Sequence, residues 1–326
     1  VAPNPRLSLV YEGIALCRRE QVDFLLAVGG GSVIDSAKAI GYGLVNDGDV
    51  WDFYDFKRQA EGCLPIGAVL TIAAAGSEMS GSCVITNEDG WLKRGSTRSD
   101  LCRPKFTLMN PRLTYTLPEY QTESGCVDIL MHTMERYFVN VETMEITDSI
   151  SESLMQTVIY NARILLNEPG NYNARAEIMW AGSLSHNGLT GCGTGGGDWA
   201  CHQLEHELGG MFDVTHGAGL AAVWGSWARY VYMNDIPRFA KFAVNVMDVP
   251  YNYADPEKTV LEGIEALEDF FRSIHMPTSV RELGVELTEA QILELAYKCS
   301  HMDKRTIGGI QKLTRSDMAE IYRMAK

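Results

Sequence analysis

The first third of the chain alternates short apolar runs with segments of helical spacing. Residues 22–28 form an apolar run of strand length without a polar face, which predicts a strand buried on both sides. Residues 66–72 and 106–109 predict two further strands. Residues 9–17 carry apolar side chains at helical spacing. Strands that alternate with helices in this way predict an α/β domain with a parallel sheet.

Beyond residue 118 the spacing of apolar residues becomes mostly helical. Residues 127–137 and 260–271 repeat apolar side chains at the period of an amphipathic helix. The change predicts two domains, an α/β domain at residues 1–118 and an all-helical domain at residues 119–326.

The first predicted strand runs directly into three glycines and a helical segment. Gly29, Gly30 and Gly31 follow the strand, and Ser32 is expected to cap the helix that comes next. Glycines let the backbone approach a ligand closely, and free N–H groups at a helix N-terminus attract negative charge. The segment therefore predicts a loop that cradles a diphosphate, although three glycines also suit a tight turn.

Histidines at helical spacing mark a second site in the predicted helical domain. Asp128 and His132 are four residues apart, as are His202 and His206, so each pair shares one helix face. His216 follows in a stretch that resembles a turn. One carboxylate and several imidazoles can close around one divalent ion. Three other histidines have no partner at ligand spacing and are expected outside the site: His186, His275 and His301.

Composition excludes several classes of partner. The net charge of −14 argues against a nucleic-acid backbone or an anionic membrane surface. No apolar run is long enough to span a bilayer. The eight cysteines are scattered without a C-x-x-C pair, which predicts reduced thiols and a cytoplasmic protein.

Six segments point to a known family. Their order and spacing resemble the iron-containing (group III) alcohol dehydrogenases, and in particular the butanol dehydrogenase-like branch: GGGSVIDSAKAI, TIAAAGSEMS, NPRLTYTLP, CVDILMHTMERYF, DWACHQLEHELGG and DVTHGAGLA. The resemblance implies a Rossmann-like dinucleotide-binding domain followed by an all-helical metal domain. It also implies four metal ligands: Asp128, His132, His202 and His216.

The same resemblance assigns further residues to the cofactor and the substrate. The positions that match the diphosphate loop, or that line the ribose and nicotinamide in the family, are Gly29, Gly30, Gly31, Ser32, Asp35, Thr71, Ser80, Lys93 and Leu113. We interpret His206 as a catalytic residue that hydrogen-bonds the substrate oxygen or relays its proton. The family implies Fe²⁺, and Zn²⁺, Ni²⁺ and Mn²⁺ accept the same ligands.

Two departures from the family pattern affect the cofactor. Ala75 stands in a loop that is usually rich in threonine, so it offers no hydroxyl to the cofactor. Family chains also usually begin earlier, with additional strands, and one of those strands carries the residue that distinguishes NAD from NADP. The sequence is therefore expected to be a fragment, or to lack its N-terminal part here. Because the branch that it resembles often uses NADP, the resemblance favours NADP over NAD.

Together these features imply an enzyme that transfers a hydride between nicotinamide C4 and an alcohol or aldehyde held by the metal ion. The resemblance points to a short-chain primary substrate such as butanol or butanal, and to a homodimer. Two alternatives stay open. One is a glycerol dehydrogenase-like or dehydroquinate synthase-like enzyme of the same architecture, and the other is a metal-binding relic without activity.

Overall fold

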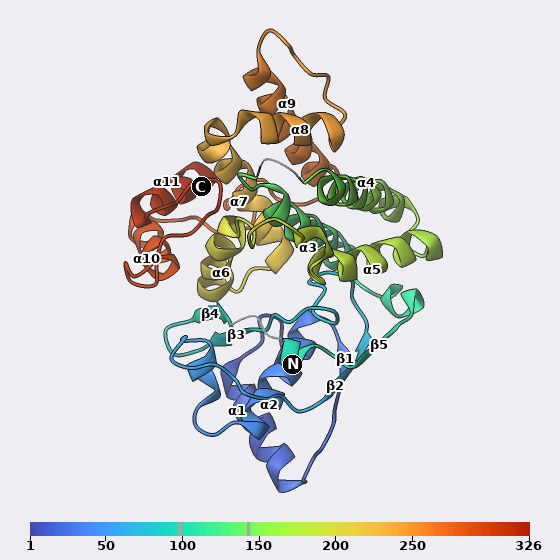
Figure 1. The fold of residues 1–326 in the computed structure, drawn as a ribbon, viewed down its shortest axis with the longest axis vertical. Helices are drawn as coiled ribbons and strands as arrows, with labels where there is room; N and C mark the ends of the chain where they lie inside the picture. The colour runs from blue at the N-terminus through green and yellow to red at the C-terminus, as the bar shows by residue number, and fades with distance from the viewer. Residues whose placement is uncertain (97–99, 142–143) are drawn as a thin grey trace.

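The computed structural model describes residues 1–96, 100–141 and 144–326. A small α/β part contains a three-stranded parallel sheet, and a larger all-helical part lies against it (Figure 1). This arrangement confirms the predicted fold class.

The sheet has the order β1-β2-β5, and its strands are parallel. Their bounds are Leu25–Gly29 for β1, Ile66–Leu70 for β2 and Phe106–Met109 for β5. Gly29 pairs with Leu70, and Leu70 pairs with Met109, so the carboxyl ends of all three strands lie at one edge. Open parallel sheets bind ligands at this edge.

The prediction that the first strand is buried on both sides is wrong. Leu26 is 54% exposed and Val28 is 57% exposed, whereas Ala27 between them is buried. Successive side chains of a strand point to opposite faces. The face that carries Ala27 packs into the core with Ile34 of α2 (Gly31–Val45), and the other face of β1 lies open.

A two-stranded antiparallel hairpin was not predicted from the sequence. It consists of β3 (Val84–Asn87) and β4 (Leu92–Gly95). Figure 1 shows it directly beneath α6 (Ala200–Phe212), at the boundary between the two parts of the molecule. The hairpin therefore forms a contact between the α/β part and the helices.

The α-helical part is organised around α3 (Glu119–Tyr137), which is buried from Thr122 to its end. It packs against α4, α5 and α7. The remaining helices are α1 (Leu7–Arg19), α4 (Glu145–Asn167), α5 (Tyr172–His186), α7 (His216–Val231), α8 (Ile236–Asn245), α9 (Pro256–Ser273), α10 (Glu289–Cys299) and α11 (Arg315–Ala325). Short 3₁₀ turns are η1 (Val50–Phe53), η2 (Asp100–Cys102), η3 (Pro111–Thr114), η4 (Leu189–Gly191) and η5 (Tyr232–Asn234).

The main hydrophobic core is continuous across both parts. It runs from Ala27 and Ala68 in the sheet to Val127 and Leu130 in α3. Among the described residues, no helix is both long enough and apolar enough to cross a membrane.

Candidate metal centre and cofactor loop

Three helices bring the four predicted metal ligands together. Asp128 and His132 lie one turn apart on α3, with Asp128 Oδ1 3.1 Å from His132 Nδ1. His202 on α6 and His216 on α7 each place Nε2 3.7 Å from the same Asp128 oxygen. Side chains that are far apart in sequence thus converge on one carboxylate.

The position of His216 differs from the sequence expectation. It is the first residue of α7 and does not lie in a turn. The sequence signal for a turn was Gly217, but this glycine has a packing role. A Cβ atom at Gly217 would lie 2.0 Å from the Ser124 carbonyl oxygen, so only glycine lets α7 approach α3 this closely.

Buried polar atoms without partners show that the cluster fits a cation. Asp128 Oδ1 and His202 Nε2 are both buried, and within the described part of the chain neither has a hydrogen-bond partner. Buried polar groups nearly always have a partner, so these two atoms need an explanation. The ligand atoms of Asp128, His132 and His202 lie within 4.8 Å of one another. A divalent ion between them would satisfy both atoms.

Each histidine is oriented by a hydrogen bond at its Nδ1. His132 Nδ1 lies 3.0 Å from the Asp128 carbonyl oxygen, and His202 Nδ1 lies 3.0 Å from Glu135 Oε1. His216 Nδ1 contacts Glu205 Oε2. An Nδ1–H donated in this way leaves Nε2 free to bind a metal.

Sequence reasoning missed both carboxylates that orient these rings. Glu135 lies three residues after His132, and Glu205 lies three residues after His202. That spacing places each carboxylate on the ligand-bearing face of its helix, so the signal was present. An acidic residue on a mostly buried helix face deserved the same weight as the histidines.

Without a bound cation, the buried carboxylate and imidazoles of this cluster retain a proton. Burial alone would raise the pKa of Asp128, but His132 and His216 outweigh it and hold that pKa well below its usual range. Burial lowers the pKa of His132 to about 4. Burial opposes the charge on His202, but the carboxylates of Asp128 and Glu135 raise its pKa to about 9. Binding of a metal would therefore displace a proton from His202.

The helix that follows the glycine loop begins earlier in the sequence than predicted. Gly30 is the N-cap residue of α2, and the helix begins at Gly31, so the expectation that Ser32 caps it is wrong. Gly30 has an extended backbone, and a Cβ atom there would lie 2.1 Å from Ile72 Cγ2. The first intrahelical bonds run to the Gly30 carbonyl from Val33 and Ile34. The N–H groups before them point out of the helix, where an anion can bind.

The other residues assigned to the cofactor lie around this loop or beyond it. Thr71 directly follows β2, and its N–H donates to the Gly29 carbonyl over 3.1 Å. Asp35 accepts from the Val84 N–H over 2.8 Å and from the Ser77 hydroxyl, so its carboxylate holds the 77–84 segment. The remaining three are spread out: Ser80 is buried, Leu113 is exposed in η3, and Lys93 is buried beside α6.

The loop after β2 joins the two sites. A Cβ atom at Gly125 of α3 would lie 2.3 Å from the Ala73 carbonyl oxygen. A Cβ atom at Gly76 would lie 2.7 Å from His186 Cβ. The carboxyl edge of the sheet therefore packs directly on the helices that carry the metal cluster.

Comparisons with known proteins agree with this geometry. The family model described as "Iron-containing alcohol dehydrogenase" matches residues 1–111, and the one described as "Fe-containing alcohol dehydrogenase family, C-terminal" matches residues 122–326. A "Probable NADH-dependent butanol dehydrogenase 2" of Bacillus subtilis is 39% identical over 99% of this chain and 82% of its own. The chain belongs to the iron-containing alcohol dehydrogenase family.

Two further relatives show the range within this family. The crystal structure of "NADH-dependent butanol dehydrogenase A" from Thermotoga maritima has a TM-score of 0.94 and 37% identity, and the match covers 100% of this chain and 82% of that chain. The "NADPH-dependent aldehyde reductase YqhD" of Escherichia coli is 31% identical over 100% of this chain and 84% of its own. The domain boundary predicted after residue 118 falls between the ranges that the two family models match.

Two more histidines flank the predicted metal ligands of this family member. His206 lies with its ring centroid 5.8 Å from that of His216, and burial, together with Lys93, keeps its pKa well below its usual range. His186 was expected outside the site, but its ring centroid is 4.1 Å from that of His132. The pattern could not reveal this contact because His186 stands on α5 without a neighbouring ligand in sequence.

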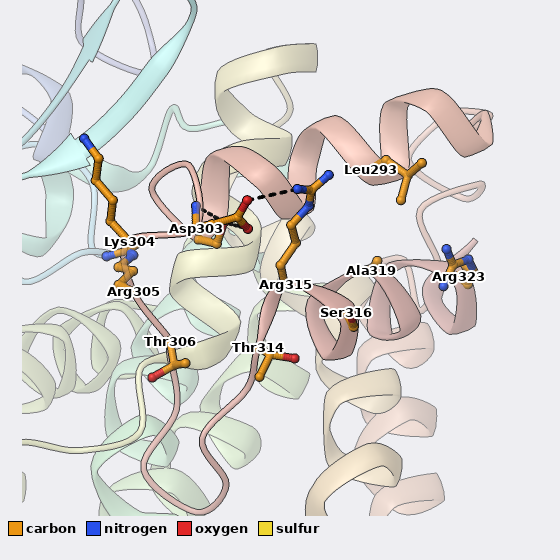
Figure 2. A pocket seen from close by; sticks show the side chains of 11 residues that line it. Leu293, Asp303, Lys304, Arg305, Thr306, Thr314, Arg315, Ser316, Ala319 and Arg323 are labelled. Carbon is orange, nitrogen blue, oxygen red and sulfur yellow. Dashed lines mark hydrogen bonds and ion pairs between the residues drawn. The ribbon is translucent and has the colours of Figure 1, made fainter.

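A separate cavity of about 1080 Å³ lies between α10 and α11 (Figure 2). Two of its basic side chains have acidic partners, as Arg315 pairs with Asp303 over 3.1 Å and Arg323 pairs with Glu289 over 2.5 Å. The lining residues are Leu293, Ser300, Asp303, Lys304, Arg305, Thr306, Thr314, Arg315, Ser316, Ala319 and Arg323. This set shares no member with the residues predicted for the metal or the cofactor.

Proposed function

We propose that the protein is a metal-dependent, NAD(P)-linked alcohol dehydrogenase that also works as an aldehyde reductase. The observation that carries the proposal is the pair of unsatisfied buried atoms, Asp128 Oδ1 and His202 Nε2, in a cluster packed against the loops at the carboxyl edge of the sheet. This reaction needs a cation site next to a site that binds a dinucleotide, and here the cation site lies against the edge of the sheet proposed to bind the dinucleotide. The names of the relatives from Bacillus subtilis and Thermotoga maritima support butanol and butanal as substrates.

The metal ligands that we propose are Asp128, His132, His202 and His216, with Fe²⁺ as the physiological ion and Zn²⁺, Ni²⁺ or Mn²⁺ as substitutes. When bound, the ion supplies a Lewis acid for the substrate oxygen, and the nicotinamide supplies or accepts the hydride. Glu135 and Glu205 keep the imidazoles aimed at Asp128.

His206 is the proposed catalytic residue. Its imidazole is buried beside His216 and is neutral near pH 7, because burial and the charge of Lys93 keep its pKa low. A neutral imidazole can accept a proton from an alcohol or return one through its other nitrogen. The contribution of such a positioned group is on the order of 10²–10⁴ in rate.

For the cofactor, we propose that Gly29, Gly30, Gly31 and Ser32 hold the diphosphate and that Asp35 fixes the neighbouring segment. Thr71, Ser80 and Leu113 are the proposed contacts to the ribose and nicotinamide. We propose NADH as the preferred form, which reverses the preference for NADP that the resemblance suggested. The relatives at 39% and 37% identity are named NADH-dependent, and the one at 31% is named NADPH-dependent.

We also propose a homodimer in the cytoplasm. The homodimer is what the family resemblance implies. Within the described residues no disulfide joins two of the cysteines, which supports a reducing compartment.

The test is consumption of NADH and of NADPH by the Fe²⁺-loaded protein in the presence of butanal. We expect saturable turnover that a chelator abolishes and added Fe²⁺ restores, with a higher kcat/KM for NADH. Faster turnover of a polyol than of butanol would favour the glycerol dehydrogenase-like alternative. Metal binding without turnover of either nucleotide would favour the relic.

A further inference from the structure

The β3–β4 hairpin delivers one lysine to the rear of the metal cluster. Gly209 and Gly210 of α6 have no side chains where β4 crosses the helix, and a Cβ atom at Gly210 would lie 2.6 Å from the Trp91 carbonyl oxygen. The gap admits Lys93, whose Nζ would lie 2.9 Å from a Cβ atom at Gly209. The lysine is 5% exposed, so its ammonium is almost fully removed from solvent.

The Lys93 ammonium forms an ion pair with one buried carboxylate, that of Glu205. Lys93 Nζ lies 3.1 Å from Glu205 Oε2 and 3.4 Å from Oε1. The Glu205 side chain is fully buried. A carboxylate in such a place is costly unless a charged group and hydrogen bonds compensate it. Lys93 supplies the opposite charge, and His216 supplies a further hydrogen bond.

The same carboxylate decides which nitrogen of His216 carries the proton. His216 Nδ1 is closer to Glu205 Oε2 than to Lys93 Nζ, which is 3.3 Å away. Carboxylate oxygens only accept, so Nδ1 donates to Glu205 and Nε2 is left with a lone pair facing Asp128. The opposite tautomer would put a proton where the cation must bind.

Glu135 offers a comparison within the same cluster. Its Oε1 accepts from both the backbone N–H and the Nδ1 of His202, over 2.9 and 3.0 Å. Glu205 is instead paired with a lysine that comes from the other part of the molecule. Glu135 and Glu205 thus each orient one metal-binding histidine. Of these two carboxylates, only Glu205 is paired with a residue of the hairpin.

We propose that Glu205 is a positioning residue for the metal ligand His216, and that Lys93 holds Glu205 in place. The inference rests on the proposed function, because it presupposes the cation site. It gives Lys93 a structural role in addition to the contact with the ribose and nicotinamide that the family resemblance implies. It also makes the β3–β4 hairpin part of the metal centre.

The first experiment measures metal affinity by competition between the metal-free protein and a chelating dye for Zn²⁺. We expect Glu205→Gln to bind Zn²⁺ about 10–100-fold more weakly than wild type, as is usual for partners of ligating histidines. Glu207→Gln is the matched control, since Glu207 is buried on the same helix and its Oε2 has no hydrogen-bond partner among the described residues. Equal Zn²⁺ affinity in Glu205→Gln and wild type would overturn the positioning role.

Nitrogen-15 spectra of the metal-free protein give a readout that loss of packing alone would not change. Wild type should show His216 protonated at Nδ1, and Glu205→Gln should shift the tautomer equilibrium of His216 toward Nε2–H. A wild-type spectrum with His216 protonated only at Nε2 would contradict the assignment.

The role of Lys93 is tested by a double variant. Lys93→Met should lower the thermal midpoint strongly because it leaves Glu205 charged and unpaired, and Lys93→Met with Glu205→Gln should recover much of the loss. An unchanged thermal midpoint in Lys93→Met, or no recovery in the double variant, would show that Lys93 does not hold Glu205 in place.

These outcomes are separable from failure of the proposed function. If wild type binds no Zn²⁺ or Fe²⁺, the metal centre itself is wrong. If wild type binds the metal and turns over butanal but Glu205→Gln binds as tightly, only the positioning role is wrong.

Discussion

The metal cluster and the glycine loop are built by opposite means. The cluster consists of buried side chains, and further buried side chains such as Glu135 and Glu205 fix their orientation. The loop consists of glycines, and its geometry requires that residue 30 has no side chain. The proposed metal site should therefore lose its ion when one of its polar side chains is replaced. The glycine loop should lose its ligand when a larger side chain is introduced.

The largest effect is expected for His202→Ala, which removes a proposed metal ligand and one of the two buried atoms that lack a hydrogen-bond partner. Turnover of butanal should fall by about a thousandfold or more. Binding of NADH, measured by fluorescence titration, should stay near wild type. His275→Ala serves as control because that side chain is 66% exposed. Wild-type kcat in His202→Ala would remove the metal assignment.

The matching change in the loop is Gly30→Val, which should weaken NADH binding by about a hundredfold while Zn²⁺ affinity is kept. The added side chain also meets Ile72, so loss of packing must be separated from loss of the anion site. Gly30→Ala with Ile72→Ala relieves that clash. Recovery of NADH binding in this pair would show that Gly30 serves packing alone.

A smaller effect concerns pH, at a carboxyl close to the cluster but outside its ligands. Burial raises the pKa of Glu207 from 4.5 to about 7, while Arg305 partly offsets the shift. Between these values the folded protein binds more protons than the unfolded chain, so this group's contribution to the free energy of unfolding falls as pH rises. Glu207→Gln should be more stable than wild type by about 3 kcal/mol at pH 8.

The pH dependence of that difference is the critical measurement, by urea unfolding of both proteins. At pH 5 Glu207 is largely protonated in the folded state, so the gap between variant and wild type should nearly close. A gap that does not change with pH would show that Glu207 is not held in its neutral form.

The smallest effect is a gain in the glycine loop. Ala75 Cβ would lie 3.2 Å from a Cβ atom at Gly31, so residue 75 faces the loop. Ala75→Thr restores a hydroxyl there and should tighten NADH binding by about threefold, the value of one modest hydrogen bond. Ala75→Val adds similar bulk without the donor and should give no gain. Equal binding in both variants would place the cofactor away from residue 75.

Local features of both sites could be predicted from the sequence. Asp128 and His132 share one helix face in the structure, as predicted, because the geometry of a helix sets this arrangement without contacts to the rest of the chain. The strand, glycine and helix order at Gly30 is also local, although the exact cap residue was not. Such features depend on neighbours within one or two turns, which the sequence displays directly.

Features that depend on distant contacts could not be predicted. The β3–β4 hairpin is short, and its second strand, Leu92–Gly95, is largely polar and carries no alternating pattern. Gly217 suggested a turn, but its small size serves the packing of α7 on α3. The partner of Lys93 is 112 residues away, so only the folded chain could reveal it.

The close approach of β4 to α6 has a consequence for how the two parts of the molecule can move. Because the Trp91 backbone rests against Gly210, the two parts of the molecule cannot separate at this point without losing the buried Lys93 pair. A relative motion of the two parts that preserves this ion pair would therefore leave the hairpin seated on α6, and Glu205 would keep its contact with His216.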